Sequence, residues 1–153
     1  MPVNRLALSA TIHCLTGCSI GEVLGMVIGT ALHWHDLPTI LLSVALAFLF
    51  GYSLTMRPLS VSGLSLGRAT RLALAADTMS IAVMELVDNG FMLAVPGAMD
   101  AHVTDVLFWA TLAASLLVAG VAAYPVNHWL IARGRGHAVV HEHHAAGKHE
   151  STR

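Results

Sequence analysis

Sulfur and carboxylate side chains recur every four residues near the start of the chain, in the stretch HCLTGCSIGEVLGM. The repeated positions are Cys14, Cys18, Glu22 and Met26. Four residues advance a helix by about one turn, so these side chains would share one side of a helix. Thiolate, thioether and imidazole groups favour Cu(I) or Zn(II), whereas carboxylates favour harder ions. This set and the adjacent His13 therefore predict a metal site without selecting the metal.

A second polar set occurs in the stretch LALAADTMSIAVMELVDNGFML. On a helical wheel, an arc of roughly 140° contains its polar and thioether side chains: Asp77, Thr78, Met84, Glu85, Asp88, Asn89 and Met92. A carboxylate in a membrane interior costs roughly 2.5 to 3.5 kcal/mol on insertion scales, so acids here should face protein or a water-filled path. We expect this arc to face the first set, with Glu85 opposite Glu22.

Histidines and further acids lie near the ends of these segments. The stretches HWHD and DAHVTD supply the candidate outer ligands His33, His35, Asp36, Asp100, His102 and Asp105. We expect an ion to be captured there, mainly by the histidines, and to lose its water at Glu22, Glu85 and Asp88.

The opposite end of the path would receive the ion on softer groups. The candidates are Cys14, Cys18 and His13, together with Asp77, His128 and the soft ligands Met26, Met84 and Met92. The direction of such transport is not fixed by these residues.

The composition indicates a membrane protein. The chain is 56% hydrophobic and 11% charged, with a mean hydropathy of +0.69, whereas soluble domains carry about 25% charged residues. A spanning helix needs roughly 20 apolar residues, and the stretches long enough are 9–32, 38–56, 72–95 and 106–131. The net charge of −1 provides no basic excess for nucleic acid. We expect an all-α integral membrane four-helix bundle in the lipid bilayer.

Glycines run beside the Cys and Glu positions of the first stretch, at Gly17, Gly21, Gly25 and Gly29. Small residues at this spacing let another helix approach closely. The thiols and Glu22 should therefore face protein rather than lipid.

The basic residues predict the topology. They precede the first stretch, lie between the second and third, or follow the fourth: Arg5, Arg57, Arg68, Arg71, Arg133, Arg135 and Lys148. Under the positive-inside rule both termini are cytoplasmic.

The chain divides into a membrane domain, 1–133, and a His-rich tail, 134–153. The tail has too few apolar residues to pack and should be disordered. Its histidines are His137, His141, His143, His144 and His149. Two interpretations of this tail are about equally favoured: it binds metal, or it is a solubilising segment.

Three functions fit these features, and none of them is an enzyme. The first is transport or binding of a transition-metal ion, such as copper. The second is a membrane redox protein, with His13 and His128 as axial haem ligands or the thiols relaying electrons to a quinone. The third is an accessory subunit without chemistry. Four helices barely enclose a conduit, which favours a homo-oligomer or a membrane partner.

The stretches HCLTGCSIGEVLGM, TMSIAVMELVDNG and YPVNHWL resemble a family of small bacterial membrane proteins that is classed as a domain of unknown function. The resemblance extends from about residue 9 to residue 133. It implies about four spans and a location in the bacterial cytoplasmic membrane, and it assigns no site residues.

Overall fold

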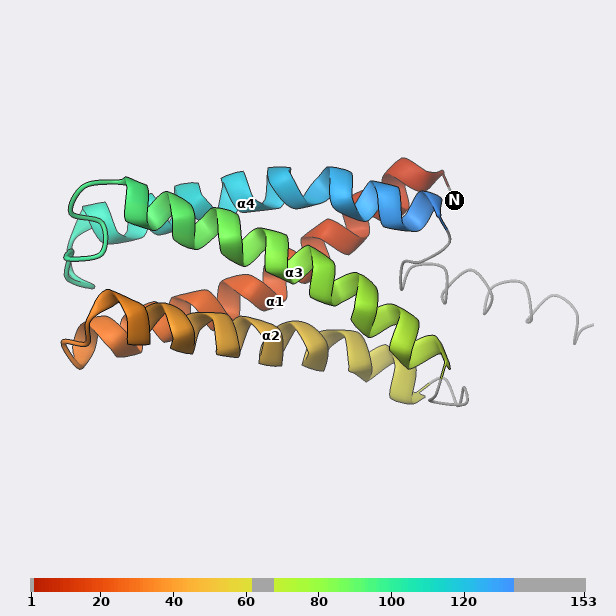
Figure 1. Ribbon diagram of the computed structural model, residues 1–153, viewed down its shortest axis with the longest axis horizontal. Helices are drawn as coiled ribbons and strands as arrows, with labels where there is room; N and C mark the ends of the chain where they lie inside the picture. Colours follow the sequence, from red (N-terminus) through yellow and green to blue (C-terminus); the bar gives the residue numbers. More distant parts are fainter. Residues whose placement is uncertain (1, 62–67, 134–153) are drawn as a thin grey trace, which may run out of the picture.

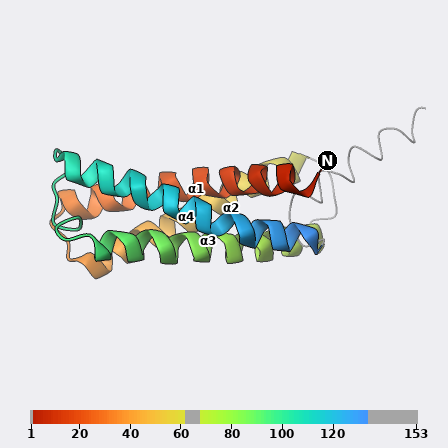
Figure 2. The same ribbon diagram turned by 90° about the horizontal axis from the view of Figure 1, so that it is seen from above.

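The computed structural model describes residues 2–61 and 68–133 and is all-α. Its helices are α1 (Val3–Ala31), α2 (Asp36–Val61), α3 (Arg68–Ala94) and α4 (Val106–Ala132). They lie side by side, and each runs antiparallel to the one before it (Figures 1 and 2). The expected four-helix architecture is confirmed. α1 begins at Val3, about six residues before the apolar stretch, because its first polar turn is also helical.

Three of the helices are long and apolar enough to cross a membrane, over Val3–Ala31, Asp36–Met56 and Val106–Ala132. α3 has a similar length, 27 residues, but carries the polar arc identified in the sequence. It packs along the other helices with most of that arc turned inward, at Asp77, Met84, Glu85, Asp88, Asn89 and Met92. Thr78 differs from the prediction, because its side chain is exposed and lies 2.7 Å from the Tyr52 hydroxyl at the bundle surface.

The glycines of α1 form its contact with α2. A Cβ atom on Gly17 would lie 2.7 Å from the Cα atom of Gly51, and one on Gly21 would overlap the backbone of Ala47. Real Cβ atoms do not come that close to backbone, so only glycine allows this approach. The predicted close helix contact is confirmed. Because the glycine face of α1 is held against α2, the orientation of the adjacent face, which carries the thiols and Glu22, is also fixed.

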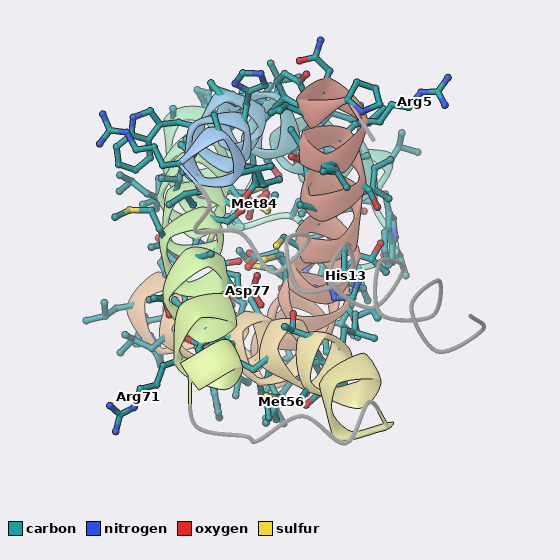
Figure 3. The ribbon with its side chains drawn as sticks, turned by 90° about the vertical axis from the view of Figure 1, so that its right-hand side faces the viewer. Arg5, His13, Met56, Arg71, Asp77 and Met84 are labelled. Carbon is teal, nitrogen blue, oxygen red and sulfur yellow. The ribbon has the colours of Figure 1, made fainter. Side chains whose placement is uncertain are left out.

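Basic residues and connecting loops lie at opposite ends of the bundle. The segments 32–35 and 95–105 are at one end, while the ends of α1 and α4 that carry Arg5 and Arg133 are at the other (Figure 1). Viewed from that second end, Arg5 and Arg71 point outward (Figure 3). We call the loop end the outer end and the basic end the inner end.

Candidate functional site

Three carboxyl groups meet in the interior of the bundle, and we call them the carboxyl cluster: Glu22 of α1 with Glu85 and Asp88 of α3. Their side chains are 0%, 6% and 1% exposed, respectively. Glu22 interacts electrostatically with both acids of α3. The structure therefore brings together the acids that the sequence placed on two separate helices.

The carboxyl cluster has few hydrogen-bond donors. The side-chain amide of Asn89 donates to the backbone oxygen of Glu85 at 3.0 Å and to its carboxylate at 3.4 Å. Ser115 lies beside Asp88, but its hydroxyl donates to the carbonyl oxygen of Leu112 at 2.8 Å. Among the described residues, neither carboxylate oxygen of Glu22 or of Asp88 has a hydrogen-bond partner.

The described part of the chain also places no Lys or Arg at this depth. Lys and Arg are absent from residues 6–56 and 72–132, which contain the whole carboxyl cluster. Three uncompensated carboxylates in a membrane interior would cost on the order of 8 to 10 kcal/mol, by the insertion cost of each acid. Compensation must therefore come from protons or from a bound cation.

The carboxyl cluster lies closer to the outer end of the bundle than to its inner end. Glu22 precedes the end of α1 at Ala31 by nine residues, and Glu85 precedes the end of α3 at Ala94 by nine residues. At about 1.5 Å per residue, both lie about 13 Å from the outer end, close to half of a hydrocarbon core that is about 30 Å thick.

The two thiols lie on the inner side of the carboxyl cluster. Cys14 and Cys18 are free cysteines, 2% and 1% exposed. The Cys18 thiol contacts the Glu85 carboxyl group, and the Cys14 sulfur lies 3.8 Å from Oδ1 of Asp77. Met84 packs in the same buried group as the thiols, and Figure 3 shows Asp77 and Met84 between the helices. Sulfur and carboxyl groups thus continue from the carboxyl cluster toward the inner end.

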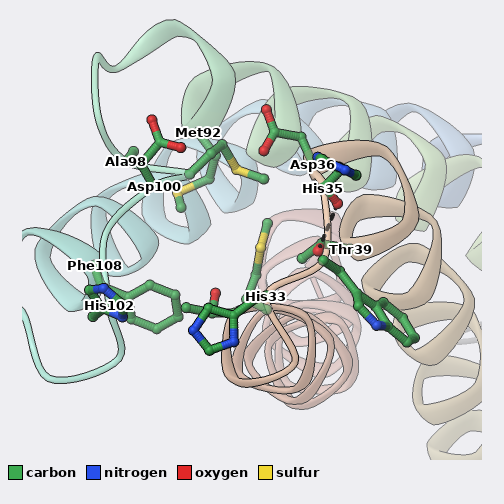
Figure 4. A pocket seen from close by; sticks show the side chains of 13 residues that line it. His33, His35, Asp36, Thr39, Met92, Ala98, Asp100, His102 and Phe108 are labelled. Carbon is green, nitrogen blue, oxygen red and sulfur yellow. Dashed lines mark hydrogen bonds between the residues drawn. The ribbon is translucent and has the colours of Figure 1, made fainter.

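A pocket of about 310 Å³ opens at the outer end, and we call it the vestibule. Its lining includes five of the predicted outer ligands, His33, His35, Asp36, Asp100 and His102 (Figure 4). The sixth, Asp105, instead accepts a hydrogen bond from the backbone N–H of His102 at 2.9 Å. The vestibule also contacts Met26 and Met92. Each lies one helical turn outward from an acid of the carboxyl cluster, so the two sites adjoin.

The inner histidines have different partners. Nε2 of His13 lies 3.4 Å from the Thr55 hydroxyl on α2, whereas Nε2 of His128 lies 3.0 Å from Oδ1 of Asn4 on α1. Asn4 and His13 are nine residues apart on one helix, about 13 Å along its axis. Two axial haem ligands must bind the same iron atom, and this geometry does not favour that pairing.

Within residues 2–61 and 68–133, no group of three or more His, Cys, Asp or Glu side chains is arranged to hold a metal ion. The tail histidines His137, His141, His143, His144 and His149 lie outside the described residues.

Sequence reasoning missed several residues around these sites. Ser115 and Ser80 are fully buried beside Asp88 and Cys14, and Met99 and Phe108 line the vestibule. A lone serine in an apolar helix commonly bonds its own backbone, as Ser115 does, and so carries little signal. Met99 lies in a loop without helical periodicity.

The chain belongs to the family described as Domain of unknown function (DUF4396), whose model matches residues 3–136. No curated protein and no solved structure matches the chain.

Proposed function

We propose that this protein transports a metal cation across a membrane and exchanges it for protons at the carboxyl cluster. The observation that carries the proposal is Glu22, which is fully buried, faces Glu85 and Asp88, and receives no hydrogen bond from any described residue outside the carboxyl cluster. Inserting an acidic side chain into a membrane interior costs free energy, and acids found there usually mark a functional site.

The exchange of protons for a metal cation follows because no Lys or Arg of residues 2–61 and 68–133 neutralises the carboxyl cluster. Protons and a metal cation would neutralise the same three carboxyl groups and would therefore compete for them. A cation entering the carboxyl cluster would displace those protons and draw the carboxylates around itself.

The neighbouring groups give the cation a route. The vestibule adjoins the carboxyl cluster on its outer side through Met26 and Met92. On its inner side, Glu85 contacts Cys18 and Asp77 lies beside Cys14. A metal that accepts both oxygen and sulfur ligands could pass from one group to the next, as a transition metal can.

The orientation belongs to the same proposal. With Arg5, Arg71 and Arg133 at the inner end, the positive-inside rule places that end in the cytoplasm and the vestibule outside. A bacterial cytoplasmic membrane is the setting that we propose.

Purified protein in liposomes tests the proposal. A metal-sensitive dye and a pH-sensitive dye inside the vesicles would report Cu(I) or Zn(II) entry and proton exit. The Glu22→Gln variant should slow metal movement by about tenfold or more, the rate change that matches about 1.4 kcal/mol. Glu150→Gln removes an acid outside the region matched by the family model and should transport normally.

Thermal unfolding in detergent separates function from folding. Glu22→Gln removes an uncompensated buried acid, so the variant should unfold at the same temperature or higher. Wild-type transport by a folded Glu22→Gln variant would overturn the proposal.

A further inference from the structure

Three thioethers converge at the vestibule. Met26 of α1 and Met92 of α3 are each 1% exposed and belong to one buried group with Phe108. Met99, from the loop between α3 and α4, packs against that group. All three line the same pocket of about 310 Å³. Thioethers are soft, uncharged ligands, so a set of three without a thiolate favours a soft monovalent ion such as Cu(I).

Two imidazoles complete the lining at the mouth of the vestibule. The ring centroids of His33 and His102 lie 6.4 Å apart, although one residue follows α1 and the other precedes α4. Figure 4 shows both rings beside the pocket, with Met92 above them in this view. The carboxyl groups of Asp36 and Asp100 also line it and would attract a cation.

The backbone conformation of His33 is a second observation, independent of the residues that line the vestibule. His33 has φ 55°. Its N–H donates to the Thr30 carbonyl at 3.1 Å, and the N–H of Trp34 donates to the Gly29 carbonyl at 2.9 Å. This pair of bonds defines a Schellman motif, in which the left-handed position is usually glycine. A side chain at this position is disfavoured by the backbone, and strained positions of this kind cluster at ligand-binding sites.

We propose that the vestibule binds a soft monovalent cation, Cu(I) or its analogue Ag(I), through Met26, Met92 and Met99 with His33 and His102. This inference rests on the proposed function, because the vestibule selects the transported ion only if the protein is a metal transporter. It adds the class of metal.

Titration of the full-length, detergent-purified chain with Ag(I) tests this site. Trp34 lines the vestibule, so tryptophan fluorescence would follow binding together with calorimetry. A Cys14→Ser, Cys18→Ser background removes the thiols, which also bind soft metals. In that background, combined Met26→Leu, Met92→Leu and Met99→Leu changes should weaken Ag(I) binding by about 100-fold, or about 2.7 kcal/mol. Leucine keeps the packing volume of methionine.

The matched control is Met79→Leu, because Met79 is 51% exposed and lies away from the vestibule. That variant should bind Ag(I) as the parent does. Unchanged binding in the triple variant, or Zn(II) displacing Ag(I) at equal concentration, would overturn the inference.

The His33→Gly variant separates ligation from folding. Glycine relaxes the left-handed backbone, so thermal stability should stay the same or rise, while Ag(I) binding weakens by about tenfold. Unchanged binding would remove His33 from the site and contradict the five-ligand proposal.

Combining the vestibule measurement with Glu22→Gln distinguishes the two proposals. Ag(I) binding that persists in Glu22→Gln while transport stops would support both. Transport without vestibule binding in the otherwise unchanged protein would overturn this inference alone. Vestibule binding with transport that does not depend on Glu22 would overturn the proposed function alone.

Discussion

The sulfur atom of Cys14 on α1 lies 3.8 Å from Oδ1 of Asp77 on α3, although 63 residues separate them in the chain. Both side chains are buried, at 2% exposed each. The contact places a soft ligand next to a hard one on the inner side of the carboxyl cluster. If the proposed route is correct, a cation that leaves the carboxyl cluster meets this pair before the inner end.

The thiols should therefore influence transport more than folding. Serine keeps a hydroxyl donor beside Asp77 but removes the sulfur ligand, so Cys14→Ser should slow Cu(I) movement in liposomes by about tenfold. Cys14→Ala should slow it at least as much, because it removes both the ligand and the donor. Melting temperatures within a few degrees of wild type would show intact folding. Normal Cu(I) rates in both variants would exclude Cys14 from the route.

The acids of the carboxyl cluster should act as one unit. Glu22→Gln and Asp88→Asn each remove one member of a mutually interacting pair. Groups that act together show strongly non-additive kinetic effects. The double variant should therefore transport no more than about threefold slower than the slower single variant, in the same liposome assay. Independent, multiplying losses would indicate that the two acids serve separate steps.

Close packing between α1 and α2 should tolerate no side chain at Gly21. A Cβ there would overlap the backbone nitrogen and Cα of Ala47. Gly21→Val should then destabilise the protein by about 3 kcal/mol, the upper end of overpacking effects. Gly90→Ala is the matched control, because the added Cβ would meet no described atom within 4 Å apart from its chain neighbours and the backbone of its own helix. Its helix propensity should make it neutral or stabilising by up to about 1 kcal/mol, as measured by thermal or denaturant unfolding.

The helices and the facing of their polar residues could be predicted from sequence because two strong physical signals agree. Apolar length predicted four helices, of which α1, α2 and α4 are apolar enough to cross a membrane. The insertion cost of acids placed Glu85 and Asp88 inward. The glycine spacing in α1 likewise predicted a close contact, although only the structure shows that Ala47 and Gly51 of α2 supply it. Thr78 was misplaced because a hydroxyl can bond its own helix, as it does to the Leu74 carbonyl at 2.6 Å, and so tolerates the surface.

The vestibule was harder to predict because its parts come from separate helices and loops. His33 and His102 could be named from residue type alone, but nothing in the sequence shows that their rings lie 6.4 Å apart. Met99 lies in a loop and has no helical periodicity. The left-handed backbone position of His33 is usually occupied by glycine, so the sequence does not predict it there. Tertiary contacts decide these features.

A buried side-chain hydrogen bond joins α1 and α4 near the inner end. The Asn127 amide donates to the Thr11 hydroxyl at 2.9 Å, and the Thr11 hydroxyl donates in turn to the Ala7 carbonyl at 2.9 Å. Thr11→Val should reduce unfolding free energy by about 0.6 kcal/mol, and by no more than about 1.7, as for other interhelical bonds in membranes. Thr16→Val is the control, since its exposed hydroxyl bonds only to the Ile12 carbonyl. Equal losses in the two variants would show that the interhelical bond contributes nothing.

The orientation of the bundle can be tested with single cysteines in a Cys14→Ser, Cys18→Ser background. Leu37 is 67% exposed near the outer end, and Arg71 is exposed near the inner end. In cells, a membrane-impermeant maleimide should label Leu37→Cys directly, but Arg71→Cys only after permeabilisation, because positive charge favours the cytoplasm. The reverse pattern would place the vestibule in the cytoplasm, and the cation would then meet the methionines from inside the cell.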